Sequence, residues 1–484
     1  MVGLYIGLIG YIAISFIVSI WSGKAGSKNS KSYIVGERNY GPVLTAFGMG
    51  TTLASGFAFI GMVGMGYTMG IIASWQCIFG TILEFCCWYF LAKKCRELSI
   101  KTESITPIEA MSHLHGDPKN LIKIIGGLFI GVFMIFYLAG QFNAGAVACS
   151  AMGLDASAIA ILIAVLTVLF IFLGGMNAAM WTNAVQGVIM IAAFFVLIAI
   201  ALAQVGGINN LFGQLSITAP ELIDWRSGRT SKEAIFYICN YWLGSSMGFL
   251  AQPQGVQKFL SLKDNRSARV SALMSCVFNI IRQLGPVLIG MCCRLLYPDI
   301  ANPSAGIPTL ILDYLPNVIG GIVMAGIFAA IMSTTEGLLL QGVAELSRNF
   351  LQLGVFSKRT ISEKSSNIIN KVLTIALGIG GLLISLFGSG GVFELIVFAW
   401  TGLITSFAPP LFFGLYWKKC TSQGMLAGVI TGIPSTVIWY YCFKATTGIH
   451  EAVSLIVPVL AVIIVSLCTQ NIKQEENYAA QLAD

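Results

Sequence analysis

Residues 332–337 read MSTTEG, and their hydroxyl and carboxyl groups interrupt an apolar run from Val318 to Val343. Ser333 and Thr334 could each bond a carbonyl four residues back in a helix, which is a purely structural use of a hydroxyl. Neighbouring hydroxyls and the carbonyls of unwound backbone could instead coordinate a hard cation such as Na⁺, which takes several oxygen ligands. Glu336 is different, because an acid inside an apolar span is costly and indicates a function.

The composition shows what surrounds this segment. The chain has 484 residues, of which 56% are hydrophobic and 10% are charged, and its mean hydropathy is +0.82. Soluble domains are about 45–50% apolar and about 25% charged. The shortage of charge predicts an all-α polytopic membrane protein with one transmembrane domain over 1–470 and a short cytoplasmic tail over 471–484. Residues 1–21 lack a basic start and a cleavage motif, so we expect a first span there instead of a signal peptide.

Apolar runs of the required length, about 20 residues, predict thirteen membrane spans. These are 3–21, 42–68, 71–92, 124–149, 157–174, 185–205, 234–253, 270–296, 317–346, 370–388, 392–415, 424–443 and 452–468.

The basic residues predict the orientation of these spans. Most of the 28 Lys and Arg residues lie in one alternate set of loops and helix ends, including the segments 93–101 and 258–269. Cytoplasmic loops carry such an excess. We therefore expect a cell-membrane protein with its N-terminus outside and its C-terminus in the cytoplasm. The formal net charge of +7 is attributed to this orientation and to anionic lipid, and no nucleic-acid partner is expected.

Two predicted spans contain polar, glycine-rich stretches, GMGTTLASG at 48–56 and LGSSMGFLAQPQG at 243–255. Backbone can leave the helix at membrane depth only where protein covers it or where it lines a wet cavity. If both are broken helices five spans apart, the core consists of two five-span halves, about 42–205 and 234–415, with a binding site between them. The alternative is that the glycines only permit close helix packing.

Four stretches together resemble the sodium/solute symporter family, which includes sodium/proline, pantothenate, sialic acid, sugar and iodide transporters. They are SYIVGERNYGPVLTAFGMGTTLASG (32–56), FLGGMNAAMWTNAVQGVIM (172–190), GIFAAIMSTTEGLLLQGVAELSRN (326–349) and FAWTGLITSFAPPLFFGLYWKKCTSQGMLAG (398–428). The resemblance implies a five-plus-five inverted repeat of the leucine-transporter type, with Na⁺ as the coupling ion. It places a Na⁺ site between spans two and nine, formed by the carbonyls of Thr51, Ala54 and Ala330 and the hydroxyls of Ser333 and Thr334.

The chain departs from the family at two places. The sodium/proline branch has an aspartate where this chain has Leu53, and many members have an acid where it has Asn183. In the sialic acid branch that acid helps to bind a second sodium ion, with hydroxyls at the positions of Glu336 and Gly337. We therefore hypothesise that Glu336 restores the charge opposite Asn183 and serves a second cation or a proton. The rival hypothesis is a structural role, as a salt bridge or as a protonated acid bonded to Asn183.

Substrate in this family contacts the broken helices and the neighbouring spans. The matching candidates are Ser55, Gly56, Phe57, Tyr137, Gln141, Ser245, Ser246, Phe249 and Gln252. Neither quoted broken segment contains Lys or Arg, so an anionic group of the substrate would rely on helix N-termini and amides. The sodium/proline branch also has a tyrosine at Tyr137, whereas GIPTLILDYLP (306–316) resembles the pantothenate branch.

These features predict a symporter that couples inward Na⁺ flow to uptake of a small solute by alternating access. Proline or a similar amino acid ranks first, followed by pantothenate or a monocarboxylate, with sialic acid or a sugar below them. An enzyme is not expected, since no nucleophile–base pair, metal cluster or phosphate loop is evident. A sensor or channel ranks lower, since neither a signalling domain nor a repeated pore loop is evident. No cofactor other than Na⁺ and no obligatory protein partner is expected.

Overall fold

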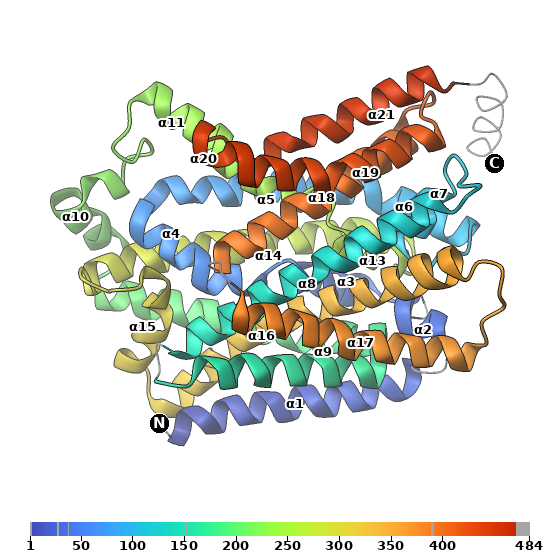
Figure 1. The fold of residues 1–484 in the computed structure, drawn as a ribbon. Helices are drawn as coiled ribbons and strands as arrows, with labels where there is room; N and C mark the ends of the chain where they lie inside the picture. The colour runs from blue at the N-terminus through green and yellow to red at the C-terminus, as the bar shows by residue number, and fades with distance from the viewer. Residues whose placement is uncertain (1, 27–28, 37, 151–152, 389–391, 471–484) are drawn as a thin grey trace.

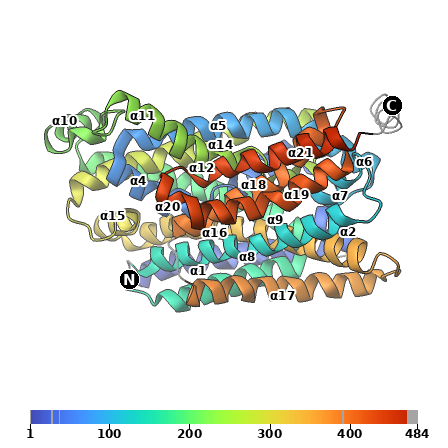
Figure 2. The same cartoon turned by 45° about the horizontal axis from the view of Figure 1, so that its top comes forward.

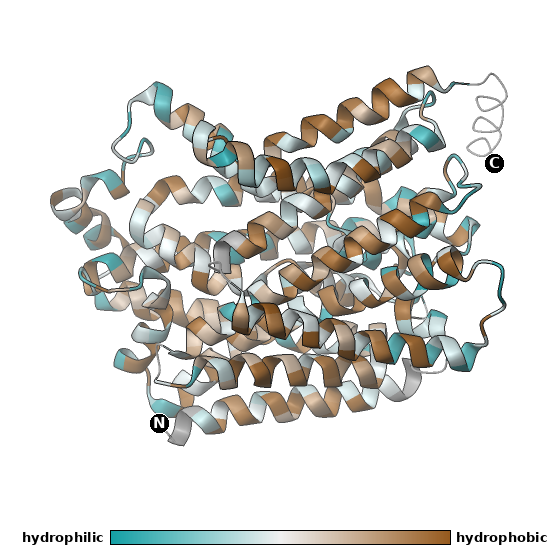
Figure 3. Cartoon of the chain, in the orientation of Figure 1, coloured by the Kyte–Doolittle hydropathy of each residue, from teal (hydrophilic) through white to brown (hydrophobic). Residues whose placement is uncertain are grey.

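The computed structural model describes residues 2–26, 29–36, 38–150, 153–388 and 392–470, and the predicted tail at 471–484 lies outside them. The described chain is a bundle of roughly aligned helices without a β-strand (Figures 1 and 2). Hydrophilic residues gather at the two ends of the bundle, while its middle is mainly hydrophobic (Figure 3). This distribution is the one that a lipid bilayer requires.

The α-helices of the first half of the chain are α1 (Val2–Gly26), α2 (Ser30–Val35), α3 (Pro42–Thr52), α4 (Met62–Met69), α5 (Trp75–Cys87), α6 (Lys93–Lys101), α7 (Pro107–Ser112), α8 (Leu121–Ser150), α9 (Ala156–Gln204) and α10 (Ile208–Thr218). Those of the second half are α11 (Ser231–Tyr237), α12 (Gly244–Ser246), α13 (Pro253–Leu260), α14 (Asn265–Leu296), α15 (Gly306–Tyr314), α16 (Asn317–Ala344), α17 (Glu363–Phe387), α18 (Val392–Tyr416), α19 (Ser422–Ile438), α20 (Lys444–Thr447) and α21 (Ile456–Cys468). The π-helical or 3₁₀ segments that matter below are η1 (Phe57–Gly61), η3 (Trp88–Ala92), η5 (Ile238–Leu243), η6 (Met247–Phe249) and η8 (Glu345–Val355).

Within the described residues, ten helices are long and apolar enough to cross a membrane. The thirteen predicted spans differ from this number because continuous helices cover more than one of them. Residues 57–101 join two spans, and α9 joins two more across Gly175, whose φ of 54° is not helical. The span predicted at 234–253 is divided into short helical segments, and none of them is long enough to cross a membrane by itself. The fold class is confirmed, and the number of spans stays a prediction.

Local sequence explains where several helices begin. Side chains of Asp155, Asp264, Ser362 and Thr421 accept hydrogen bonds from backbone N–H groups in the first turns of α9, α14, α17 and α19. Such caps satisfy donors that have no partner within the helix. These capping residues lie in the short polar segments between apolar runs. Each of these segments therefore ends one membrane span and begins the next helix.

Both predicted helix breaks are present. α3 ends at Thr52, and the chain turns through Leu53 and Ala54 before η1 and α4 continue the span. The second broken helix runs through α11, η5, α12 and η6, is interrupted at 251–252, and resumes in α13 at Pro253. Proline suits this first position because its φ is preset and it needs no N–H acceptor there.

The two broken helices run in opposite directions. Tyr40, just before α3, pairs with Leu262, just after α13, and the Lys263 N–H donates to the Tyr40 carbonyl at 3.2 Å. The start of one broken helix therefore lies beside the end of the other. α16 packs against α1, α3, α8 and α9, and its residues from Val323 to Ala344 are buried. α16 is thus the buried helix against which the first break is held.

Candidate ion and substrate site

Four of the five predicted ion ligands converge where α3 ends beside α16. The Ser333 hydroxyl lies 3.1 Å from the Thr51 carbonyl oxygen and 3.0 Å from that of Ala330. The Thr334 hydroxyl lies 3.3 Å and 3.1 Å from the same two oxygens. The two hydroxyls thus make the local bonds of an ordinary membrane helix and also reach across to the broken one. Neutral oxygens at this spacing fit a weakly held Na⁺.

Ala54, the fifth predicted ligand, lies in the turn after α3. Its N–H donates to the Thr51 carbonyl at 3.0 Å. Its carbonyl belongs to the same peptide group as the N–H of Ser55, which donates to the Thr334 hydroxyl at 2.9 Å. Ser55 has a φ of 55°, a left-handed conformation that costs a non-glycine residue energy and often marks a functional site. The break is therefore held directly by the hydroxyl-bearing turn of α16.

A second polar cluster lies on the next turn of α16. Buried Glu336 accepts hydrogen bonds from the Thr182 hydroxyl at 2.5 Å and from the Gln186 amide at 3.1 Å. Asn183 instead donates to the Thr52 hydroxyl at 3.2 Å. A structural bond between Glu336 and Asn183, one form of the rival hypothesis, is therefore absent from these described side chains. Successive residues of a helix are rotated by about 100° from each other, so Thr182 and Asn183 point in different directions.

The Thr182 hydroxyl in this cluster has one hydrogen and three possible acceptors, one of which is the Ala179 carbonyl at 3.2 Å. It lies 2.8 Å from the Ala178 carbonyl as well as 2.5 Å from the Glu336 carboxyl. An ionised Glu336 takes that hydrogen, whereas a protonated Glu336 donates its own and leaves the hydroxyl to bond Ala178. Asn183 Oδ1 and Gln186 Oε1 are buried without a hydrogen-bond partner among the described residues. Such unsatisfied amide oxygens suit a cation, whereas a proton would bind the Glu336 carboxyl.

An aromatic cluster lies between the two breaks and centres on Trp400 of α18. Its ring centre is 5.0 Å from that of Phe249, 6.1 Å from that of Phe57 and 6.1 Å from that of Tyr137. Gly56 beside it permits close packing, since a Cβ there would lie 2.4 Å from that of Ala144. Trp400 was missed as a candidate because a single tryptophan in an apolar span is usually packing, although it lies in the quoted stretch 398–428.

Polar atoms without a well-formed hydrogen bond surround this aromatic cluster. The hydroxyl of Ser246 and the amide nitrogen of Gln141 are buried and without a hydrogen-bond partner in the described part of the chain. The Tyr137 hydroxyl and the Trp400 indole nitrogen are also buried and interact with each other, but neither makes a hydrogen bond of good geometry with a described residue. Every one of these groups can donate a hydrogen bond, and two can only donate. A ligand with an acceptor-rich group such as a carboxylate would satisfy them.

The other substrate candidates have different roles. The Gln141 amide oxygen accepts from the Gly56 N–H at 2.8 Å, which fixes its nitrogen as the free donor. Gln252 contacts the aromatic cluster through a 3.4 Å bond from its amide to the Trp400 carbonyl. Ser245 instead donates to Gln76 of α5 at 2.6 Å, an interaction between distant segments that the sequence analysis did not anticipate.

Comparison with known proteins identifies the family. Residues 33–432 match the model of the sodium:solute symporter family, which is most of the chain. The chain belongs to the sodium:solute symporter family. This membership establishes a multi-pass membrane transporter and not an enzyme, with Na⁺ as its coupling ion.

Curated relatives of this symporter match over nearly their whole length. The osmoregulated proline transporter OpuE of Bacillus subtilis is 26% identical over 472 residues, covering 96% of this chain and 94% of the relative. The sodium/proline symporter of Staphylococcus aureus is 27% identical over 482 residues, covering 96% and 93%.

Solved structures support the fold of the symporter. A Na⁺-coupled sialic acid symporter in a substrate-bound outward-open state superposes with a TM-score of 0.80 at 18% identity, covering 97% of this chain and 98% of the other. Mhp1, a nucleobase-cation-symport-1 family transporter, gives a TM-score of 0.54 at 12% identity, covering 93% and 95%. The expected leucine-transporter-type core is therefore confirmed.

Two basic side chains of the symporter, Arg282 and Lys258, are buried near the helix breaks. Arg282 of α14 pairs with Glu84 of α5 at 3.1 Å and donates to the Leu53 carbonyl at 2.6 Å. Its guanidinium also lies 5.1 Å from the Phe249 ring centre. Arg282 therefore contacts residues at both helix breaks, and Glu84 balances its charge.

Lys258 is the other buried cation. The sequence analysis placed it in the cytoplasmic set of loops and helix ends, and it is buried in α13, with its ammonium 3.9 Å from the Met176 sulfur. No carboxylate among the described side chains lies within ion-pairing distance of it. The sequence could not show this because Lys258 lies at the edge of a polar loop segment.

Proposed function

We propose that this symporter takes up proline or a similar small amino acid with Na⁺. The observation that carries the proposal is the aromatic cluster around Trp400 with its unpaired donors, directly beside the convergent oxygens of α3 and α16. The donors would hold the carboxylate of the amino acid. The aromatic faces would hold its ammonium group and apolar ring through cation–π and packing contacts. The proline transporters among the relatives support this ranking.

We propose that Na⁺ binds the carbonyls of Thr51, Ala54 and Ala330 and the hydroxyls of Ser333 and Thr334. An ion held there would tie the end of α3 to α16, next to Ser55, Gly56 and Phe57 of the substrate site. Ion binding and solute binding would then stabilise the same arrangement of the first break, which is the physical basis of coupling. The proposal includes two five-span halves, 42–205 and 234–415, and a cell-membrane protein with an outer N-terminus and a cytoplasmic C-terminus.

Uptake by the purified chain in proteoliposomes tests the substrate. We expect an inward Na⁺ gradient to drive accumulation of labelled proline, and an ionophore that collapses the gradient to stop it. Trp400→Leu should raise the KM for proline about thirtyfold, because a desolvated cation–π contact contributes about 2 kcal/mol and 1.4 kcal/mol is tenfold in affinity. Trp439→Leu, which alters a tryptophan outside the aromatic cluster, is the matched control and should leave the KM unchanged.

The same assay decides between the alternatives. Pantothenate, short monocarboxylates and sialic acid are tested beside proline, since each carries a carboxylate that the free donors could bind. Preferential uptake of one of them would replace proline in the proposal. Na⁺-independent conductance without solute accumulation would instead favour a channel.

We further propose that the cluster of Glu336, Thr182, Asn183 and Gln186 binds a second cation or a proton. Glu336→Gln keeps the size of the side chain and removes its charge. If the cluster binds a second Na⁺, the Na⁺-to-solute ratio should fall by one ion in this variant. If it binds a proton, the pH dependence of uptake should disappear.

Glu345→Gln is the control for this experiment, because Glu345 is also buried in the same continuous helical run and bonds Gln341 at 2.7 Å. It should change neither the ion ratio nor the pH dependence. Unaltered ratio and pH dependence in Glu336→Gln would show that the cluster is structural.

A further inference from the structure

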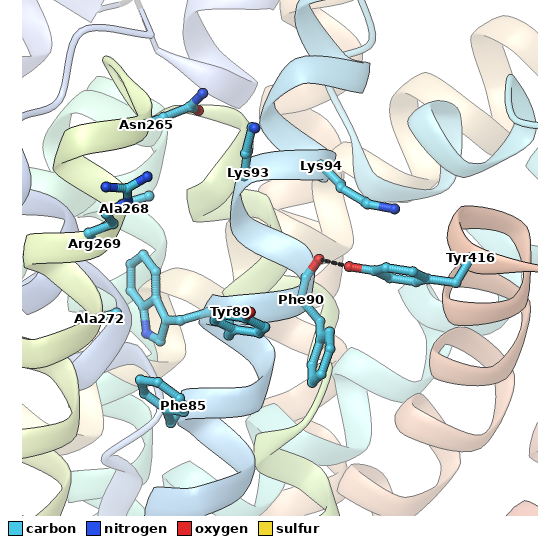
Figure 4. Close-up of a pocket in the computed structure, with 11 residues that line it drawn as sticks. Phe85, Tyr89, Phe90, Lys93, Lys94, Asn265, Ala268, Arg269, Ala272 and Tyr416 are labelled. Atoms are coloured by element: carbon cyan, nitrogen blue, oxygen red, sulfur yellow. Dashed lines mark hydrogen bonds between the residues drawn. The ribbon is translucent and has the colours of Figure 1, made fainter. Parts of the chain in front are cut away.

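A groove of about 640 Å³ opens on the outside of the bundle, away from the site described above. It is bounded by the end of α5 with η3 and the start of α6, by the first turns of α14, and by Tyr416 at the end of α18 (Figure 4). The groove lies where the apolar span of α5 and η3 changes into the charged segment KKCRELSIK of α6. It therefore crosses the boundary between the hydrocarbon and the headgroup region.

The groove has an aromatic half and a basic half. Phe85, Tyr89 and Phe90 form the first, with 53%, 70% and 40% of their surfaces exposed. Lys93, Lys94 and Arg269 form the second, and Figure 4 shows the two sets at opposite ends of the groove. Large exposed aromatic side chains next to basic ones are typical of a surface that meets lipid at the membrane interface.

The charge of the basic half is largely uncompensated. Arg269 is exposed and makes no hydrogen bond or ion pair with any described residue. Lys93 has a 3.9 Å contact with Glu97, and both side chains are exposed, so this pair is weak. Lys94 points its ammonium at the Tyr416 ring, 3.6 Å from its centre, and donates to the Leu415 carbonyl. None of the residues that line the groove is acidic.

The walls of the groove are tied together. The Tyr416 hydroxyl donates to the Phe90 carbonyl at 2.6 Å, which links α18 to η3 (Figure 4). Trp88 is buried at the base and packs on Phe259 of α13 with 4.7 Å between the ring centres. A preformed groove costs little conformational entropy on binding.

We propose that this groove binds one anionic phospholipid, with its phosphate at Lys93, Lys94 and Arg269 and an acyl chain along Phe85, Tyr89 and Phe90. A free inorganic anion would leave the aromatic half unused. A zwitterionic phospholipid also has a phosphate, but the positive charge of its headgroup ammonium would offset that phosphate beside the three basic residues. Only a ligand with both an anionic head and an apolar chain matches both halves, and basic pockets between membrane helices bind such headgroups.

Native mass spectrometry of the full-length protein in mild detergent tests the site. The probes are dioleoylphosphatidylglycerol, dioleoylphosphatidylcholine and inorganic phosphate. We expect one phosphatidylglycerol to be retained with about tenfold preference over phosphatidylcholine. Phosphatidylglycerol has a net negative charge that attracts the three basic residues, whereas phosphatidylcholine has no net charge. Inorganic phosphate at millimolar concentration should not displace it.

Three variants locate the lipid. Lys93→Gln/Lys94→Gln/Arg269→Gln should lose the preference for phosphatidylglycerol. Lys358→Gln/Arg359→Gln/Lys364→Gln removes the same charge from an exposed loop and from the first turn of α17, and this variant should retain the preference. Ala272→Trp keeps every charge but fills the groove from α14, and should lower lipid retention. Equal loss in both triple variants, equal binding of the two lipids, or full retention in Ala272→Trp would each overturn the proposal.

Discussion

Replacing Ser333 and Thr334 with alanine is expected to weaken the activation of uptake by Na⁺ about ten- to a hundredfold. Both hydroxyls lie within 3.3 Å of the carbonyl oxygens of Thr51 and Ala330. Contacts between a polar group and a charge contribute about 1.5–3 kcal/mol, and 1.4 kcal/mol is a factor of ten in affinity. The half-saturating Na⁺ concentration, measured for each single variant and for the double variant in proteoliposomes, checks this prediction.

Thr335→Ala is the matched control for this experiment. Thr335 is buried in the same turn, but its hydroxyl lies 2.9 Å from that of Thr167 and faces away from α3. Its loss should leave Na⁺ activation within about twofold of the parent, because it removes one neutral hydrogen bond outside the ion site. Equal weakening in Thr335→Ala would mean that hydroxyls of α16 act through helix packing, and the ion site would then lie elsewhere.

Breaking the Glu84–Arg282 pair is expected to destabilise the protein by about 3–5 kcal/mol, the cost of leaving one buried charge without its partner. Glu84→Gln leaves Arg282 charged, buried and next to the first helix break. We therefore expect a large drop in the thermal unfolding midpoint in detergent. Glu84→Gln/Arg282→Met removes both charges and should recover most of that loss.

Asp224→Asn is the control, since Asp224 pairs with Arg226 at 3.0 Å on the exposed surface. Exposed pairs contribute little to stability, so its unfolding midpoint should match that of the parent.

The double variant Glu84→Gln/Arg282→Met also separates stability from function. Without Arg282 the Leu53 carbonyl loses its donor, so uptake should stay impaired even where stability returns. A fully active double variant would show that Arg282 only balances Glu84.

The arrangement of the candidate ion site could largely be predicted from the sequence and the family resemblance because its proposed ligands are local. Thr51 and Ala54 lie in one broken segment, and Ala330, Ser333 and Thr334 lie within about one turn of one helix. Each segment can be recognised from its own sequence, because hydroxyl-bearing residues and glycines interrupt an apolar run. The choice of Thr51, Ala54 and Ala330 as carbonyl ligands, and the meeting of the two segments, came from the family resemblance.

The partners of Glu336 could not be predicted in the same way. Thr182, Asn183 and Gln186 all lie on one helix more than a hundred residues away, and all three could satisfy an acid. Which of them faces Glu336 depends on the rotation of α9 about its axis, and this rotation is set by packing along its whole length. The sequence analysis expected Asn183, whereas the structure selects Thr182 and Gln186.

The sequence by itself determined the membrane class, the two helix breaks, the family resemblance and the oxygen-rich turn of α16. These depend on hydropathy, glycine content and short motifs, which act over a few turns. Only the tertiary structure decided that Trp400 centres the aromatic cluster, that Arg282 pairs with Glu84, and that Lys258 is buried. Each of these depends on contacts between helices far apart in the chain. Many pairs of side chains in such helices could interact chemically, and the packing of the helices brings only some of them together.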